Sequence, residues 1–207
     1  MPAYITDENL PTKQFRVWNH KSNASPKKCV PMLDALTSGY LILLWADVFI
    51  DSSNQDSTPL ISWRTSKGIF EQHGTYAQQI GAPLGFHPQP FKFMNYWRIL
   101  TPPGYSCLIT HPHGFQDSKL RAISAVIDTD RSSLQILPPL WVKKDFVGVI
   151  EKGTPIIQVT PFKRENWEAK YTVLENDKEY ENIENANFNG TLINHYIKKV
   201  WSKKSYK

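Results

Sequence analysis

Short apolar runs separated by polar, glycine-containing or proline-containing segments recur along the chain from residue 30 onward. The first block, residues 30–50, is strongly apolar, and its second half is rich in strand-forming side chains. Residues 51–57 are polar, and the short run at 60–64 follows them, so the pattern predicts a β-hairpin. Residues 66–91 hold glycines and prolines at a density that predicts turns instead of long regular elements.

A second block of short apolar runs extends from residue 91 to residue 162. Short, regularly spaced strands of this kind predict a mainly β sandwich or barrel. The Pro102-Pro103-Gly104 segment predicts a turn within the block. The predicted strands are 92–94, 96–100, 105–110, 122–127, 134–137, 146–149 and 155–161.

The apolar period changes to a helical one after Phe162. Trp167, Tyr171 and Leu174 recur at i, i+4 and i+7, which predicts a helix over 164–174. The same reasoning predicts a second helix over 192–201, after an acidic linker. We therefore expect three parts: an N-terminal arm at 1–28, a β domain at 29–163 and a C-terminal helical extension at 164–207.

The composition fits a folded chain in a reducing compartment. The 207 residues are 41% hydrophobic and 13% aromatic, which is enough for a core and excludes a wholly disordered chain. No apolar run approaches the roughly 20 residues that cross a bilayer, and the first residues lack a signal-peptide pattern. We expect a cytoplasmic protein that is not secreted, with no membrane partner, and Cys29 and Cys107 as free thiols.

The net charge of +5 is concentrated at one end of the chain. Without the final residues the domain is almost neutral, so the basic character belongs mainly to the C-terminal tail. Two interpretations stay open: a solvated helix end, or a tail that docks on nucleic acid or an acidic partner. The lysines of the tail are Lys198, Lys199, Lys203, Lys204 and Lys207.

Two segments in the second half of the chain carry a family resemblance. Residues 125–130 read Ala-Val-Ile-Asp-Thr-Asp, and residues 153–158 read Gly-Thr-Pro-Ile-Ile-Gln. They resemble, in order, the Gly-Val-Ile-Asp-x-Asp-Tyr and Gly-x-Arg-Ile-Ala-Gln motifs of dUTPases and dCTP deaminases. Ser-Gly-Tyr at 38–40 and Pro-Pro-Gly-Tyr at 102–105 are similar to the segments that begin earlier motifs. The resemblance implies a β-clip fold, and by kinship a homotrimer.

The whole chain is also similar to an uncharacterised family of tailed phages, especially marine ones, and some bacteria. Its shared features are residues 28–31, 39–40, 44–47, 102–105, 126–130, 153–155 and 161–162. This resemblance implies a phage protein of unknown function, acting as a virion component or an accessory protein in the host cytoplasm.

The departures from the dUTPase motifs fall on the chemistry. Residues 110–114 read Thr-His-Pro-His-Gly where the family has its Arg-Ser-Ser phosphate grip. Leu41 replaces an Asp, Arg131 replaces the Tyr that packs on deoxyribose, Pro155 replaces an Arg, and the glycine-rich lid motif is missing. We therefore expect a homo-oligomer that binds a nucleotide-like ligand or a partner, requires no cofactor and is not a working dUTPase.

The enzymatic alternative is a Mg²⁺-dependent nucleoside-triphosphate pyrophosphohydrolase. In it, Asp128, with Asp130 beside it, would activate a water, and Gln158 would position the loop near the substrate. A strand-end Asp that accepts turn N–H groups is the alternative interpretation of Asp128.

Further candidates come from histidines and aromatics. His111 and His113 alternate at i and i+2, so a strand would point both to one face, where they could share a metal. His87 or His73 could complete such a set, although histidines of a loop are the simpler interpretation. With Gln158, Arg131 and Tyr40, these two histidines are also ligand-binding candidates. Trp45, Trp63, Trp97 and Trp141 fill a core or offer a platform for a base or sugar.

Overall fold

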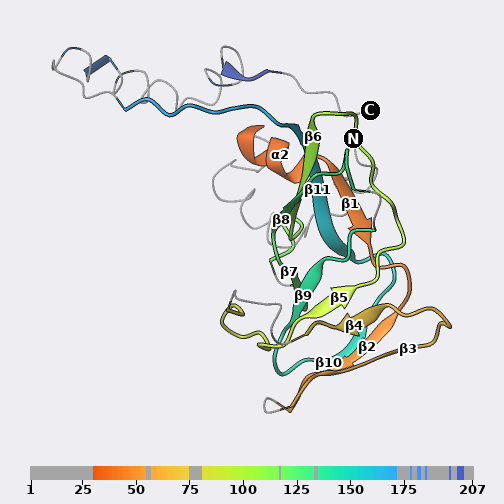
Figure 1. Cartoon of the computed structure of the whole chain (residues 1–207). Helices are drawn as coiled ribbons and strands as arrows, with labels where there is room; N and C mark the ends of the chain where they lie inside the picture. The colour runs from red at the N-terminus through yellow and green to blue at the C-terminus, as the bar shows by residue number, and fades with distance from the viewer. Residues whose placement is uncertain are drawn as a thin grey trace. The chain divides into compact units, whose positions relative to one another are not determined.

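The computed structural model describes most of the chain between residues 30 and 171 (Figure 1). The described residues are 30–54, 57–74, 81–116, 118–132, 135–171, 178, 181, 182, 185, 196 and 200–202. They belong to two compact units: Gly39–Arg164, and a second that takes in residues up to Ser38 and from Glu165 on. None of the described helices is long and apolar enough to cross a bilayer.

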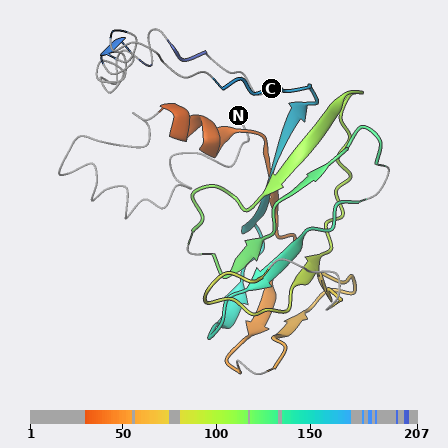
Figure 2. The ribbon, with the colours of Figure 1, turned by 60° about the vertical axis from the view of Figure 1, so that its left-hand side comes forward.

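The Gly39–Arg164 unit consists of antiparallel sheets, so the expected mainly β class is confirmed. Its described strands form three sheets, ordered β1-β11-β6-β8, β10-β2-β3 and β4-β5-β9-β7. Figures 1 and 2 show the third sheet between the other two. The strands are β1 (Tyr40–Leu43), β2 (Val48–Asp51), β3 (Leu60–Trp63), β4 (Phe70–Gln72), β5 (Phe91–Phe93), β6 (Tyr105–Thr110), β7 (Leu120–Ala122), β8 (Ala125–Ile127), β9 (Pro139–Val142), β10 (Val147–Ile150) and β11 (Pro155–Lys163).

One hydrophobic core joins the three sheets. Alternation along the strands supplies it: in β2, Val48 and Ile50 are buried while Phe49 between them is exposed. Phe93 of β5 and Ile109 of β6 belong to the same cluster of buried side chains. The predicted hairpin is confirmed, because β2 pairs antiparallel with β3.

The strands β6 and β11 form the centre of the sheet that concerns function. β11 pairs with β6 from Gln158 to Lys163, and with β1 up to Val159. Pro161 therefore lies beyond the last residue paired with β1, where its missing N–H removes no ladder bond on that side. β8 then pairs with the other edge of β6.

The first half of the first apolar block is a helix, which its apolar pattern did not identify. Val30–Thr37 forms the helix α2. Pro31 fits in its first turn, where a backbone N–H has no helical partner, and the residues that follow are mostly good helix formers. Gly39, two residues after α2, has φ of +69°. A Cβ at this glycine would lie 2.0 Å from the carbonyl oxygen of Val159, so only glycine fits beside β11.

The predicted helix over 164–174 is wrong for its described part. Residues 164–171 are neither helix nor strand. Trp167 and Tyr171, which set the helical period, are 89% and 91% exposed. A short amphipathic segment gains helical stability mainly by burying its apolar face, and these side chains bury almost nothing. Residues 172–174 lie outside the described part of the chain.

Most of the predicted 192–201 helix also lies outside the described residues. The Trp201 N–H donates to the Tyr196 carbonyl at 2.8 Å. The Trp201 indole N–H donates to Asp34 Oδ2 at 3.0 Å, so the described residues of this segment join α2 within one unit. The arm at 1–28, Cys29 and the five lysines of the tail lie outside the described residues as well.

Candidate functional site

The residues predicted to form a site lie at two ends of β6. Asp128 contacts Ser106 near the start of the strand, and Gln158 pairs with Thr110 at its end. Because Ser106 and Thr110 are four residues apart, the two positions lie on one face of the sheet but are separated by roughly 13 Å. The chain thus brings Asp128 and Gln158 to the same sheet without bringing them together.

The turn after β8 holds the two candidate catalytic carboxylates. The Asp128 carbonyl accepts hydrogen bonds from the N–H groups of Arg131 (3.0 Å) and Ser132 (2.9 Å), which closes the turn. Asp130 follows two residues later and accepts a hydrogen bond from the Gly104 N–H at 2.8 Å through Oδ2. Gly104 has φ of +86°, as the glycine of the predicted turn before β6 requires.

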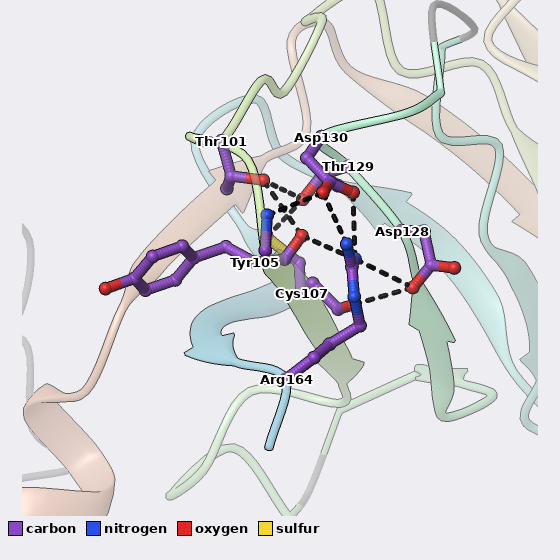
Figure 3. Close-up of polar contacts among 9 residues, drawn as sticks. Thr101, Tyr105, Cys107, Asp128, Thr129, Asp130 and Arg164 are labelled. Atoms are coloured by element: carbon purple, nitrogen blue, oxygen red, sulfur yellow. Dashed lines mark hydrogen bonds and ion pairs between the residues drawn. The ribbon is translucent and has the colours of Figure 1, made fainter. Parts of the chain in front are cut away.

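Arg164 extends from the end of β11 into this turn. Its backbone N–H donates to the Gly104 carbonyl at 2.8 Å, which fixes the end of the strand. Figure 3 shows its guanidinium between the carboxylates of Asp128 and Asp130. Nη1 donates to Asp130 Oδ1 at 2.8 Å and to Asp128 Oδ1 at 3.2 Å, and Nη2 donates to Asp130 Oδ2.

The same guanidinium reaches the start of β6. Nη1 lies 2.9 Å from both the Tyr105 carbonyl and the Ser106 hydroxyl oxygen. The Ser106 hydroxyl donates to Asp128 Oδ1 at 2.6 Å. The Tyr105 ring points away, so only its carbonyl joins the network (Figure 3). Arg164 therefore ties together three strand ends: those of β6, β8 and β11.

The electrostatics of the cluster follow from this contact. The hydrogen bonds from Arg164 hold the pKa of Asp130 well below its usual value, with help from the Gly104 N–H and the charges of Arg164 and Arg131. Asp130 in turn raises the pKa of Arg164. The Asp130 side chain is only 5% exposed, whereas that of Asp128 is 53% exposed. Asp130 is thus an ionised anchor, and Asp128 is the carboxylate that solvent reaches.

A buried polar layer lies beneath the ion pair. The Thr129 hydroxyl is 2.7 Å from that of Thr101 and 3.3 Å from the Cys107 sulfur. Thr129 and Cys107 are both buried, and burial raises the pKa of the Cys107 thiol. Cys107 is a free thiol, as expected, and its protonated state makes it a packing group instead of a nucleophile.

At the other end of β6, His111 and Gln158 organise a loop. Nε2 of His111 lies 2.9 Å from the Phe115 carbonyl, and Nδ1 accepts from the Ala122 N–H at 3.4 Å. These contacts require the neutral ring with its proton on Nε2. Burial lowers the pKa of His111, which favours the same neutral form. Gln158 is 1% exposed, and its Oε1 accepts from the His113 N–H at 3.0 Å.

These contacts do not favour the predicted histidine metal site. Both ring nitrogens of His111 are already in hydrogen bonds, and the His113 backbone, not its ring, contacts Gln158. His87 is buried elsewhere, with Nε2 3.4 Å from the Ser52 carbonyl, and the His73 backbone N–H bonds Pro90. Among the described residues, no three His, Cys, Asp or Glu side chains are grouped to hold a metal.

The remaining ligand-binding candidates lie on the surface. Arg131 is exposed at the turn after β8, and its charge contributes to the electrostatics of Asp130. Tyr40 is 50% exposed at the start of β1.

The four tryptophans divide between core and surface. Trp141 of β9 is 5% exposed, and Trp45 and Trp63 pack partly buried against the core. Trp97 is 68% exposed. It lies in a segment predicted as a strand, 96–100, that is irregular because Asn95 bonds the backbone of Trp97. The predicted strand at 134–137 is likewise absent from its described residues, 135–137.

Sequence reasoning missed Arg164, the residue with the most contacts to the predicted carboxylates. It placed Arg164 at the start of a helix, because the period of the next aromatic residues favoured one. No local signal identifies this arginine, since its position depends on the register of β11 against β6.

Comparison with known proteins gives no match for this chain among family models, curated proteins or solved structures.

Proposed function

We propose that this chain is a binding domain that recognises a ligand or partner through its surface and does not hydrolyse nucleotides. The observation that carries the proposal is the position of Arg164 between Asp128 and Asp130. The guanidinium charge pairs with the carboxylates that the hydrolase alternative would use to activate a water.

The Arg164 contact argues against Mg²⁺ in particular. Mg²⁺ is held by carboxylate oxygens, often together with substrate phosphates. Both oxygens of Asp130 accept hydrogen bonds from Arg164, and Asp128 Oδ1 accepts from Arg164 and Ser106. A divalent cation at Asp128 would also lie close to the guanidinium charge. These contacts support the proposal that no catalytic magnesium ion binds here.

The loop at 110–114, which replaces the phosphate-binding motif, also supports the absence of nucleotide hydrolysis. In phosphoryl transfer, positioning and charge stabilisation provide most of the catalysis. Here the loop has no arginine, burial lowers the pKa of His111 and so favours its neutral ring, and Gln158 accepts the hydrogen bond of the His113 N–H. The loop thus offers little to a triphosphate.

The binding role is supported by a domain that exposes the residue types found at interaction hot spots. Tryptophan, tyrosine and arginine dominate such sites. Tyr96, Trp97 and Arg98 are consecutive and exposed in this structure. The proposal includes the β-clip arrangement and the virion or accessory role that the sequence resemblance implies. Motif order along Gly39–Arg164 supports the arrangement, since both motif segments belong to one sheet.

The proposal also includes self-association with further copies of this chain. Phe49 and Val149 are cross-strand partners on the outer face of the β10-β2-β3 sheet, 37% and 56% exposed. Val147 and Leu60, 55% and 63% exposed, lie on the same face on either side of Asp51. Light scattering should give a mass above that of one chain, and Val149→Lys should lower it. A monomer at all concentrations would exclude self-association.

A turnover assay tests the central claim. Purified protein is incubated with the deoxynucleoside triphosphates and Mg²⁺, alongside Asp128→Asn and the surface control Glu71→Gln. We expect no turnover above background in any of the three. Turnover by the wild type and Glu71→Gln that disappears in Asp128→Asn would overturn the proposal and establish the hydrolase alternative.

A further inference from the structure

Two segments of the Gly39–Arg164 unit, 64–69 and 94–98, lie side by side and expose aromatic and cationic side chains. The Met94 N–H donates to the Ile69 carbonyl at 2.8 Å, and the Tyr96 hydroxyl donates to the Gly68 carbonyl at 3.0 Å. These contacts hold the segments together without making a sheet. We call the exposed side chains of Arg64, Lys67, Tyr96, Trp97 and Arg98 the aromatic platform.

Asn95 presents the Trp97 indole to solvent. Its side chain is buried at 1% exposure, and it bonds both backbone groups of Trp97: Oδ1 accepts from the N–H at 3.1 Å, and Nδ2 donates to the carbonyl at 3.2 Å. The Asn95 N–H donates to the Phe93 carbonyl at 2.9 Å, which joins this clamp to β5. A buried amide thus fixes the backbone that carries a 68% exposed indole. Such pre-organisation reduces the entropy lost when a ligand stacks on the ring.

Tyr96 is held as firmly as Trp97. Its ring meets that of Trp45 edge to face, with centroids 5.3 Å apart. Trp45 is in turn fixed by a hydrogen bond from its indole N–H to the Met94 carbonyl at 3.2 Å. The Lys67 ammonium lies 5.3 Å from the Tyr96 ring centroid, within the range of a cation–π contact. The Tyr96 ring and the Trp97 backbone are therefore both held in place, and a cation lies beside the Tyr96 ring.

The charge of the platform has one sign. Arg64, Lys67 and Arg98 are exposed, and residues 57–70 and 91–104 contain no Asp or Glu. An anionic ligand therefore meets attraction from both segments.

We propose that the aromatic platform binds single-stranded nucleic acid, a ligand class that rests on the proposed binding function. Proteins that bind single strands without strict sequence preference combine cations along the backbone with aromatic rings on which bases stack. The bases of a duplex are already stacked inside it, so their faces are not available to Trp97. An anionic protein surface would use the charge but not the ring stacking.

The test measures binding of a fluorescein-labelled oligothymidylate to the full chain by fluorescence anisotropy at low salt. Trp97→Ala should weaken binding about tenfold or more, because stacking contributes about 1–3 kcal/mol per base. Trp97→Phe, which keeps a ring, should bind with intermediate affinity. The matched control is Trp167→Ala, which removes an 89% exposed tryptophan outside the platform and should bind as the wild type does.

The cations are tested by the salt dependence of binding. Lys67→Ala should weaken binding and reduce the slope of log K against log salt by about 0.7, the value for one contact to a single strand. Lys152→Ala, an exposed lysine in the turn after β10, is the control. The double change Lys203→Ala with Lys204→Ala shows whether the basic tail contributes instead.

Three outcomes would overturn the platform proposal: no oligonucleotide binding, wild-type affinity in Trp97→Ala, or equal affinity for a duplex of the same length. Loss of binding only in the Lys203 and Lys204 double variant would assign the ligand to the tail. These results are separate from those of the turnover assay. Failure of the platform proposal shows as absent or unchanged oligonucleotide binding, whereas failure of the proposed function shows as nucleotide turnover.

Discussion

Arg164 and Asp130 form a two-pronged ion pair across the end of β6, although 34 residues separate them in the sequence. The contact joins the last residue of the Gly39–Arg164 unit to the turn after β8. Planar guanidinium and carboxylate groups match each other in this geometry, which is why an ammonium group is a poor substitute.

Loss of the arginine should destabilise the domain. Arg164→Ala leaves Asp130, whose side chain is 5% exposed, without its cation, so we expect a clear fall in the urea midpoint. Arg164→Lys should recover only part of the lost urea midpoint, because one ammonium group cannot bond both oxygens of Asp130 as the guanidinium does. Arg98→Ala, at an exposed position away from Asp130, is the control and should change the midpoint little. Equal midpoints for Arg164→Ala and Arg98→Ala would exclude the structural role.

His111 should make the stability depend on pH in mildly acidic solution. Its pKa in the folded chain lies below the usual 6.5, so the unfolded chain takes up a proton first as the pH falls. Stability is therefore complete above about pH 6.5 and declines below it. In His111→Gln this part of the decline should be missing, although stability falls at every pH because the ring's hydrogen bonds change. Urea unfolding at a series of pH values measures this dependence of stability on pH.

The pH experiment has its own control. His113→Gln leaves the His111 ring, its burial and its two hydrogen bonds in place and removes only the weakest cause of its lowered pKa, so it should keep most of the wild-type dependence of stability on pH. If the fall of stability with decreasing pH persists unchanged in His111→Gln, its assignment to His111 is wrong.

Gly39 should tolerate no side chain. A Cβ there would lie 2.0 Å from the Val159 carbonyl oxygen, in a backbone with φ of +69°. We expect Gly39→Ala to lower the free energy of unfolding by at least ~2 kcal/mol, from steric overlap and left-handed strain together. Gly68→Ala has no heavy atom within 4 Å of its new methyl group and should stay within about 1 kcal/mol of the wild type. Similar losses in both variants would disprove the close approach.

Ser52 should contribute more to the stability of the fold than the size of its side chain suggests. It is 1% exposed, and its hydroxyl donates to the Lys143 carbonyl at 2.7 Å and accepts from the Phe146 N–H at 3.0 Å. Ser52→Ala leaves both groups without this partner, which costs about 1–3 kcal/mol in unfolding free energy. Ser66→Ala, at an exposed position, should be neutral. Thermal unfolding of the two variants tests this prediction. An unchanged stability of Ser52→Ala would show that the Ser52 hydrogen bonds do not stabilise the fold.

Much of the strand pattern was predictable because it depends on local alternation and turn chemistry. The run 105–110 corresponds to β6, and the polar segment after Asp51 corresponds to the loop between β2 and β3. The helix at Val30–Thr37 was missed because its apolar residues are compatible with either element. The helix predicted from 164 failed because Trp167 and Tyr171 have nothing to pack against over the described residues.

The candidate site could be predicted only in part. Asp128 and Asp130 were identified from a motif, and they share one turn, as two residues so close in sequence must. Their partner Arg164 and the distance from Asp128 to Gln158 were not predictable, because both depend on how β6 registers against β11. The same holds for Asn95, whose buried side chain distinguishes Trp97 from the tryptophans of the core.

By itself, the amino-acid sequence determined the β class, the main turns and the residue types available for chemistry, since these follow from alternation, backbone preferences and composition. Only the tertiary structure decided which charged groups meet. Strand pairing brings together residues that are far apart in the chain, and a carboxylate's role depends on its nearest cation, not on its neighbours in sequence. Here that cation is Arg164, which makes Asp130 an anchor of the fold.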